Sequence, residues 1–341
     1  MRIALVGAGS LGTILGAYIT KAGYDITLVD TYADHVKALN EKGAHVVGTT
    51  DLVVPVKACL PEDMDGIYDL ILYMTKQTYN DTAFAQMKPH VGPNTIIVTT
   101  QNGLPEVAVA DVFGEENVMG CPVGWGATFK GPGVSELTSD PEHCTFDLGR
   151  MDGKVDDKVM MVKEVLETMC HTEVLENLMG VRWTKVLINS AFSGMSTVMN
   201  CTFGEVAENP KGMLCLQHIS NEAIQVAKAA GIRMEPMQGF KVDELLSFTN
   251  KKEMERTAIA INKLVTPHHL LRASMLQDLE HGRKCEIDAI DGVVCDMGAR
   301  YGVATPVTQQ VVDIIKKIEN GELKLDYNNI DLFTFPEVAE N

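Results

Sequence analysis

The sequence has few basic residues and no basic run anywhere along its length. Lysine and arginine number 29 against 46 aspartates and glutamates, which gives a formal net charge of -17 at pH 7. Proteins that bind nucleic acids or anionic membranes need a local surplus of lysine and arginine to neutralise phosphates. The charge balance therefore excludes nucleic acid, and argues against a membrane surface, as the expected partner.

Long apolar runs are also missing. The longest apolar stretches are short and interrupted by charges, and residues 1–6 have the pattern of a strand rather than of a signal sequence. We therefore expect a cytoplasmic protein with no membrane partner. At 341 residues the chain is long enough for two domains with substantial cores. Composition leaves the oligomeric state open, with a homodimer as one option.

Cysteine spacings typical of metal sites are absent. The eight cysteines are scattered, with no CxxC pair and no Cys/His pair at the spacing of metal ligands. We therefore expect reduced, mostly buried thiols and no metal site.

A glycine-rich motif lies at the N-terminus. The segment GAGSLG, residues 7–12, follows the predicted strand RIALV and opens a predicted helix from Ser10 to Lys21. In this context Gly7 allows a tight turn, Gly9 lets the backbone approach a pyrophosphate, and Gly12 lets the helix pack on the strand. The helix N-terminus supplies free N–H groups for phosphates. The motif predicts dinucleotide binding by Gly7, Gly9, Ser10, Leu11 and Gly12.

The second predicted strand, YDITLVD, ends at Asp30, which lies 18 residues after Gly12. A carboxylate at this place can accept hydrogen bonds from an adenosine ribose and would repel a 2′-phosphate. The next residues, TYADH, contain no lysine or arginine to offset that repulsion. Asp30 therefore favours NAD(H) over NADP(H). The alternative is that Asp30 caps a helix beginning near Ala33.

Alternating strands and helices continue to about residue 150. Further strands are predicted at 68–74, 94–100 and 116–123, helices near 34–42 and 78–88, and extended, hairpin-type segments at 129–137 and 144–149. This alternation predicts an α/β fold with a Rossmann-like, doubly wound, mostly parallel sheet. Lys76 and Asn102 follow two of the strands, where ligands of open α/β sheets bind, so both are candidate cofactor residues.

From about residue 155 the pattern is helical. Helices are predicted near 155–170, 178–200, 209–230, 239–248, 251–263, 270–281, 286–301 and 305–320. The extended link HTEVLEN marks a boundary near residue 175. We expect a Rossmann domain at 1–175, an all-helical domain at 176–325 that carries substrate and catalysis, and a weakly patterned tail at 326–341. A cleft between two such domains is the usual place for a ligand.

The predicted helix at 184–200 is apolar on most of its circumference and should be buried. At 100° per residue its polar side chains form one narrow stripe headed by a lysine. The stripe consists of Lys185, Asn189, Ser193, Ser196 and Asn200. Such a stripe inside a protein predicts contact with a polar ligand.

Taken together, these segments resemble the 2-dehydropantoate 2-reductase, or ketopantoate reductase, family over nearly the whole chain. The matching motifs are GAGSLG at 7–12, KQ at 76–77, QNG at 101–103, KVLIN at 185–189, NC at 200–201 and SMLQDLEHGRKCEID at 274–288. The resemblance implies a Rossmann domain, a helical domain, and reduction of a 2-oxo acid by a nicotinamide cofactor between them.

The resemblance also implies residue roles. Lys185 corresponds to the catalytic lysine and Glu286 to its acidic partner. Asn102 corresponds to an asparagine between cofactor and substrate, and Lys76 to a residue near the cofactor. Asn189 and Ser274 correspond to substrate-contacting positions. By chemistry, a buried lysine can give a proton to the oxygen on which charge develops during hydride transfer.

Three departures from the family pattern bear on the substrate and the cofactor. Ser193 and Phe203 stand where family members carry substrate-contacting asparagines, and Asp30 stands where basic residues commonly favour NADPH. Phe203 therefore favours a bulkier or less polar substrate, as in a D-2-hydroxy acid dehydrogenase. Two other functions stay open: a 3-hydroxy acid dehydrogenase, which also places a lysine four residues before an asparagine, and an NADH sensor without turnover. For Glu286 the alternative is an acidic first-turn residue of the next helix.

Overall fold

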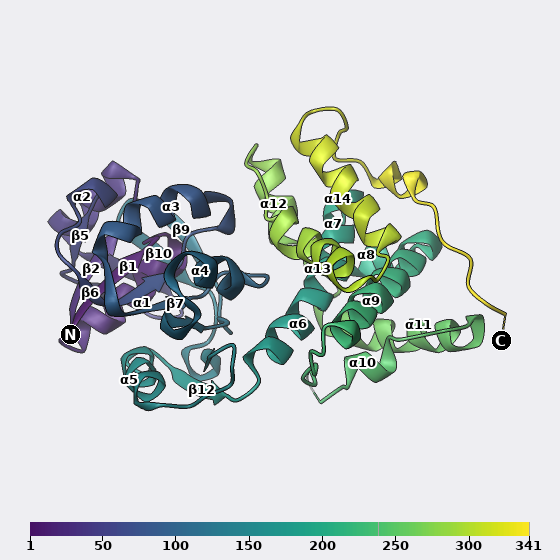
Figure 1. Ribbon diagram of the computed structural model, residues 1–341. Coiled ribbons are helices and arrows are strands. Elements are labelled where there is room, and N and C mark those ends of the chain that lie inside the picture. The colour runs from purple at the N-terminus through teal and green to yellow at the C-terminus, as the bar shows by residue number, and fades with distance from the viewer. Residues whose placement is uncertain (238, 341) are drawn as a thin grey trace. The chain divides into compact units, whose positions relative to one another are not determined.

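The computed structural model describes residues 1–237 and 239–340, and it divides into two compact units, Met1–Leu178 and Met179–Asn341. Figure 1 shows strands with flanking helices in the first unit and helices in the second. The predicted fold class, an N-terminal doubly wound sheet followed by an all-helical part, is confirmed. None of the helices in the described ranges combines the length and apolar character that crossing a bilayer takes.

The first unit is built on an eight-stranded sheet with the strand order β12-β11-β8-β7-β6-β1-β2-β5. Neighbouring strands pair in parallel, apart from β11, which meets β8 antiparallel. The strands are β1 (Arg2–Val6), β2 (Asp25–Val29), β5 (Lys57–Cys59), β6 (Tyr68–Tyr73), β7 (Val91–Thr99), β8 (Val118–Gly120), β11 (Thr145–Gly149) and β12 (His171–Leu175).

Helices cover both faces of this sheet. Alternate side chains of β1 point to opposite faces, so Leu5 joins one buried apolar cluster and Val6 the other. The first cluster includes residues of α1 (Ser10–Lys21) and α5 (Asp157–Leu166), and the second includes residues of α3 (Asn80–Met87) and α4 (Pro105–Phe113). Burial on both faces explains why β6 reads as an almost continuous apolar run.

A smaller sheet, with the order β4-β3-β10-β9, completes the first unit. Its strands are β3 (Ala44–Gly48), β4 (Leu52–Val54), β9 (Ala127–Gly131) and β10 (Val134–Leu137), and α2 (Ala33–Lys42) precedes β3. The predicted hairpin at 129–137 is confirmed, since β9 and β10 pair antiparallel. The extended segment predicted at 144–149 forms β11, which meets the preceding chain antiparallel at Gly120 and Val123 and pairs in parallel with β12 along its whole length.

The predicted link at 171–177 contributes a strand instead of a free connection. His171–Leu175 forms β12 at the edge of the large sheet, and the first unit ends at Leu178. Helix α4 was not anticipated, because the short run PEVAVADVF is apolar on too many sides to show a clear helical period.

The second unit is helical, and α7, α8, α11, α13 and α14 pack on the long α9 (Figure 1). The α-helices are α6 (Leu178–Ile188), α7 (Met195–Met199), α8 (Phe203–Glu208), α9 (Pro210–Ala229), α10 (Val242–Leu245), α11 (Lys251–Val265), α12 (Ser274–Glu280), α13 (Val293–Tyr301) and α14 (Pro306–Glu319). Two π-helical segments, η6 (Asn189–Gly194) and η8 (Asp288–Gly292), and the 3₁₀ turn η7 (Thr266–His268) lie between them, and the 3₁₀ segment η9 (Tyr327–Leu332) follows α14.

The weakly patterned tail packs on the second unit. Ile330 and Phe333 are buried, Asn329 donates to the carbonyl of Val198, and the ring of Phe335 stacks on His218 at 5.4 Å. A few apolar anchors therefore hold a segment whose composition shows no helical or strand period.

The predicted helix at 184–200 is not a continuous α-helix. Residues 189–194 form the π segment η6, and the helix ends at Asn200 in the left-handed conformation, with φ of 50°. A π segment contains an extra residue in its turn, so the side chains after it rotate away from the positions that an α-helix would give them.

The two π segments meet at Gly194 and Asp291. A Cβ added to Gly194 would lie 2.9 Å from one carboxylate oxygen of Asp291, so any larger residue here would force Asp291 or its neighbours to move. Asp291 is fully buried, and neither side-chain oxygen has a hydrogen-bond partner among the described residues. Burial raises the pKa of the Asp291 carboxyl well above its usual range.

We predict that Asp291→Asn stabilises the second unit increasingly as the pH rises. Because the folded-state pKa is raised, the contribution of Asp291 is fully present below the unfolded pKa near 3.8 and is lost as pH rises through the folded pKa. Asparagine has the same shape and no proton to lose. Between the unfolded and the folded pKa, the difference in free energy of unfolding between the variant and the wild type should grow by up to about 1.4 kcal/mol per pH unit. Thermal unfolding at several pH values measures this difference. Asp296→Asn, at an exposed position of α13, is the control; an equal response of both variants would contradict the prediction.

Candidate functional site

The glycine motif has the backbone geometry of a phosphate-binding loop. Gly7 has φ of 97°, and a Cβ there would lie 2.7 Å from the backbone nitrogen of Thr75. At Gly12 an added Cβ would lie 2.3 Å from the carbonyl oxygen of Gly7, so helix and strand touch. At Gly9 nothing lies within 4 Å. Two glycines are thus required by packing, while the third leaves open space for a ligand.

The N-terminus of α1 is suited to bind an anion. Gly9 is the N-cap, no side chain caps the helix, and its first turn contains no acidic residue. Ser10 and Leu11, both half-buried, follow directly. Uncapped N–H groups and the positive end of the helix dipole favour a phosphate here. The chain's own residues therefore fit a dinucleotide at the place that the motif predicts.

A buried histidine that sequence reasoning missed supports this loop. The Nε2 atom of His35 lies 2.7 Å from the carbonyl oxygen of Ala8, and its Nδ1 accepts a hydrogen bond from the backbone of Gly133. Because Nδ1 accepts, the proton of the neutral ring is on Nε2, which donates to Ala8. Thr13 donates to the same carbonyl at 2.7 Å. Two donors on one carbonyl hold the loop between Gly7 and Gly9 in place.

Asp30 follows β2 and is half-buried. One oxygen of its carboxylate accepts a hydrogen bond from the backbone of Tyr32 at 2.9 Å. The N-cap of α2 is Tyr32, with no side-chain cap, so Asp30 is not the N-cap of this helix. The first basic residue after Asp30 is Lys37, which pairs with Glu41 at 4.0 Å. The carboxylate thus lies where a ribose is expected, without a neighbouring cation along the chain.

The loops after β6 and β7 are held together by glutamine side chains. Gln101 donates to the carbonyl of Thr75 at 2.8 Å, and Gln77 donates to the carbonyl of Asn102. These bonds bring the loops of Lys76 and Asn102 together at the carboxyl ends of neighbouring parallel strands. Gln101 itself is buried and serves as a positioning residue. Gln101 belongs to the QNG motif, so the sequence did point to this residue, although its strand-end position predicts a ligand contact only for Asn102.

We predict opposite effects for alanine at Gly9 and at Gly12. Gly9→Ala meets no atom of the protein, so its folding free energy should change by less than about 1 kcal/mol, while NADH binding weakens by about tenfold or more because the methyl group occupies the space for the pyrophosphate. Gly12→Ala should lower the free energy of unfolding by about 1–3 kcal/mol.

Calorimetric titration with NADH and thermal unfolding distinguish the two effects, and each variant is the control for the other. Unchanged NADH affinity in Gly9→Ala would contradict a pyrophosphate at this loop.

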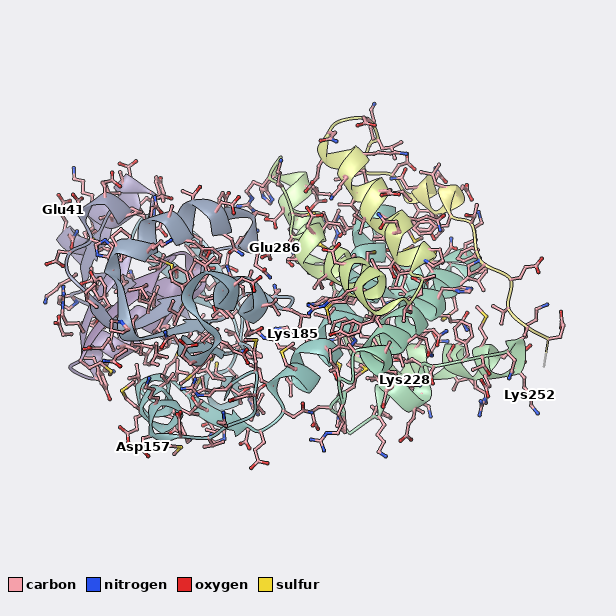
Figure 2. The ribbon with its side chains drawn as sticks, in the orientation of Figure 1. Glu41, Asp157, Lys185, Lys228, Lys252 and Glu286 are labelled. Atoms are coloured by element: carbon pink, nitrogen blue, oxygen red, sulfur yellow. The ribbon has the colours of Figure 1, made fainter. Side chains whose placement is uncertain are left out.

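In the second unit, α6 presents Lys185 from a firmly held helix. Trp183 is fully buried and donates to the carbonyl of Ala223 at 2.9 Å, and the Thr184 hydroxyl donates to the carbonyl of Glu235 at 2.7 Å. Lys185 itself is half-buried (Figure 2). The neighbours of Lys185 therefore fix the rotation of the helix about its axis.

The structure divides the predicted polar stripe. Lys185 and Asn189 are half-buried, and Ser193 is 9% exposed. Beyond the π segment the hydroxyl of Ser196 is buried and donates to the carbonyl of Cys201 at 2.6 Å. Asn200 is exposed and accepts a hydrogen bond from Arg272 at 3.1 Å. The end of the stripe thus serves the local structure, while its beginning keeps the pattern of a ligand-facing surface.

Phe203 is buried at the start of α8. A capping box, in which Thr202 and Glu205 bond reciprocally, holds this helix start. The ring of Phe203 packs on Phe192 of η6 with 5.7 Å between centroids. An apolar wall therefore lies where the resemblance predicts a polar contact.

Ser274 and Glu286 come from segments that adjoin the π segments. Ser274 is exposed at the first residue of α12, and α12 packs against η6. Glu286 is 9% exposed and lies just before η8, which packs against η6 as well (Figure 2). Its backbone carbonyl accepts from Ala289 and Ile290, so it does begin a helical segment. The segment that follows the helix of Lys185, η6, thus adjoins the elements at Ser274 and Glu286.

Comparison with known proteins identifies the family of this chain. The profile of the family described as Ketopantoate reductase PanE/ApbA matches residues 3–152, and the profile of its C-terminal domain matches residues 177–319. The chain belongs to the ketopantoate reductase family. It is therefore an oxidoreductase that acts on a small molecule with a nicotinamide cofactor, and the predicted resemblance is confirmed.

Relatives and solved structures match this chain over nearly their whole length. A 2-dehydropantoate 2-reductase of Pyrococcus horikoshii is 28% identical over 336 residues, covering 94% of this chain and 98% of the relative. A ketopantoate reductase structure from Ralstonia eutropha has a TM-score of 0.79 at 21% identity, covering 94% of this chain and 99% of that chain. A D-mandelate dehydrogenase with NADH and anilino(oxo)acetate has a TM-score of 0.77 at 22% identity, with the same coverage. These two structures share the fold.

Proposed function

We propose that this ketopantoate reductase-family chain is an NADH-dependent 2-oxo acid reductase, with Lys185 as its proton donor. The observation that carries the proposal is a half-buried lysine on a firmly held helix whose next turn, η6, adjoins the segments of Ser274 and Glu286. When bound, the reduced nicotinamide would supply a hydride to C2 of the acid. The carbonyl oxygen gains a proton, so the products are a 2-hydroxy acid and oxidised cofactor.

The proposed roles follow from the charges that arise in this reaction. Negative charge develops on the carbonyl oxygen, and the Lys185 ammonium stabilises it and gives it a proton. A carboxylate at Glu286 orients the ammonium. Asn189, one turn after Lys185, and the hydroxyls of Ser193 and Ser274 can donate to the carboxylate of the substrate.

The preference for NADH rests on Asp30. Its carboxylate suits the ribose hydroxyls of NAD(H) and repels the 2′-phosphate of NADP(H). Lys76 and Asn102, on loops joined by Gln77 and Gln101, are the proposed contacts near the nicotinamide end.

We predict that Lys185→Ala lowers kcat by roughly 100- to 10,000-fold, the range that a lost general acid produces. NADH affinity should stay unchanged, because the glycine loop belongs to the other unit. Steady-state rates with several 2-oxo acids and a calorimetric NADH titration test this prediction. Lys228→Ala, at an exposed position of α9, is the matched control.

Near-normal turnover of the Lys185 variant would remove the proposed proton donor. A wild-type protein that binds NADH but oxidises it with no acid would indicate the sensor function. Activity restricted to 3-oxo acids would indicate a 3-hydroxy acid dehydrogenase.

We predict that Asp30→Ser shifts the cofactor preference toward NADPH by about tenfold or more, since the variant no longer places like charges in contact. The measurement is the ratio of kcat/KM for NADH and for NADPH at one fixed acid. Asp34→Ser removes an exposed acidic residue from the first turn of α2, close to Asp30 in the chain, and should leave the ratio unchanged. A wild-type enzyme that prefers NADPH would overturn the role given to Asp30.

A further inference from the structure

The second unit contains an apolar cavity beside the lysine-bearing helix. Ile188, Phe192 and Phe203 line it from α6, η6 and α8, and Leu264 and Val265 line it from the end of α11. All of these apart from the half-buried Ile188 are less than 9% exposed. Helices α11 and α8 pack together around it. The cavity is thus built from the same helical run that carries Lys185 and Asn189.

Two further side chains complete the lining. Met237 is a flexible apolar side chain that can adjust to what it touches. His268 is the one lining residue with a polar side chain, and it already interacts with another residue. A hydroxyl group placed in this cavity would therefore lose its hydration for little hydrogen bonding in return.

The cavity is adjacent to the proposed reacting groups. Ile188 follows Lys185 by three residues on α6, and residues at this spacing are neighbours on a helix, with Cβ atoms about 5–6 Å apart. The helix therefore presents a polar group for the acid and the ketone, and an apolar group beside it. A 2-oxo acid has the same division between its charged head and its side chain.

The cavity is narrow. Its volume of about 20 Å³ is little more than the roughly 10–15 Å³ that one water needs. A compact, branched group therefore enters this space only as the flexible Met237 and its neighbours move outward, and a planar aromatic ring requires the surrounding helices to separate further.

We infer that this cavity binds the side chain of the substrate, and that the preferred substrate is a 2-oxo acid with a branched aliphatic side chain and no hydroxyl. The inference rests on the proposed function and specifies its substrate class. Phe203 is its specificity-determining residue, because its ring occupies the place of a polar contact and packs on Phe192. The hydroxyl-bearing side chain of ketopantoate does not suit these walls.

Trimethylpyruvate and ketopantoate provide a matched test, because they differ only by the hydroxyl group. With NADH and the full-length protein, we expect kcat/KM to be about 10- to 100-fold higher for trimethylpyruvate, the discrimination that an apolar pocket achieves against an added hydroxyl. Phenylglyoxylate, with an aromatic side chain, should be reduced less well than trimethylpyruvate.

Variants of Phe203 extend the test. Phe203→Asn should bring the ratio of the two acids toward one or invert it, with NADH affinity unchanged. Phe203→Leu keeps an apolar wall and should retain the wild-type order of preference. Should the asparagine variant not fold, the wild-type ratio alone decides.

The outcomes separate the inference from the function on which it rests. Equal or better use of ketopantoate, or highest efficiency with phenylglyoxylate, would overturn the inference and leave the reductase in place. Turnover of pyruvate but of none of the three larger acids would overturn it too. Absence of NADH oxidation with every acid, pyruvate included, would overturn the proposed function itself.

Discussion

The helix that carries Lys185 must be buried on most of its circumference and, under the proposed function, must still present polar groups to a substrate. Its structure meets both demands by a change of helical period. Up to Ile188 it is an α-helix anchored by Trp183 and Thr184. The π segment from Asn189 to Gly194 then turns the following residues into the core. Such segments are frequent at functional sites, and here the change separates polar groups available to a ligand from those that serve the fold.

The close contact of the two π segments supports this arrangement. A side chain at the position of Gly194 would collide with Asp291, and burial raises the pKa of the Asp291 carboxyl. A buried acid without hydrogen-bond partners costs stability. That cost falls on the segments that adjoin Asn189 and Glu286, so the stability of the second unit and the geometry of its proposed reacting groups depend on the same contact.

In the first unit, the equivalent constraint is the close approach of backbone to backbone. Gly7 and Gly12 are packed against neighbouring atoms, whereas Gly9 borders open space. His35 and Thr13 both donate hydrogen bonds to the carbonyl of Ala8, so the conformation of the loop is fixed before a cofactor binds. Preorganised donors bind an anion without a cost of ordering.

The sequence alone determined the features that local pattern controls: the glycine motif, helix α1, the buried parallel strands, and the mostly apolar helix headed by Lys185. A strand or helix period and a turn glycine act over a few residues, so one segment is enough to reveal them. Only the tertiary structure decided the π segment after Ile188, the contact of Asp291 with Gly194, and the bond from Gly133 to His35. Each depends on residues far apart in the chain, 98 positions in the last case. Their packing selects a conformation that no short stretch favours, and the apolar cavity around Phe203 formed in the same way.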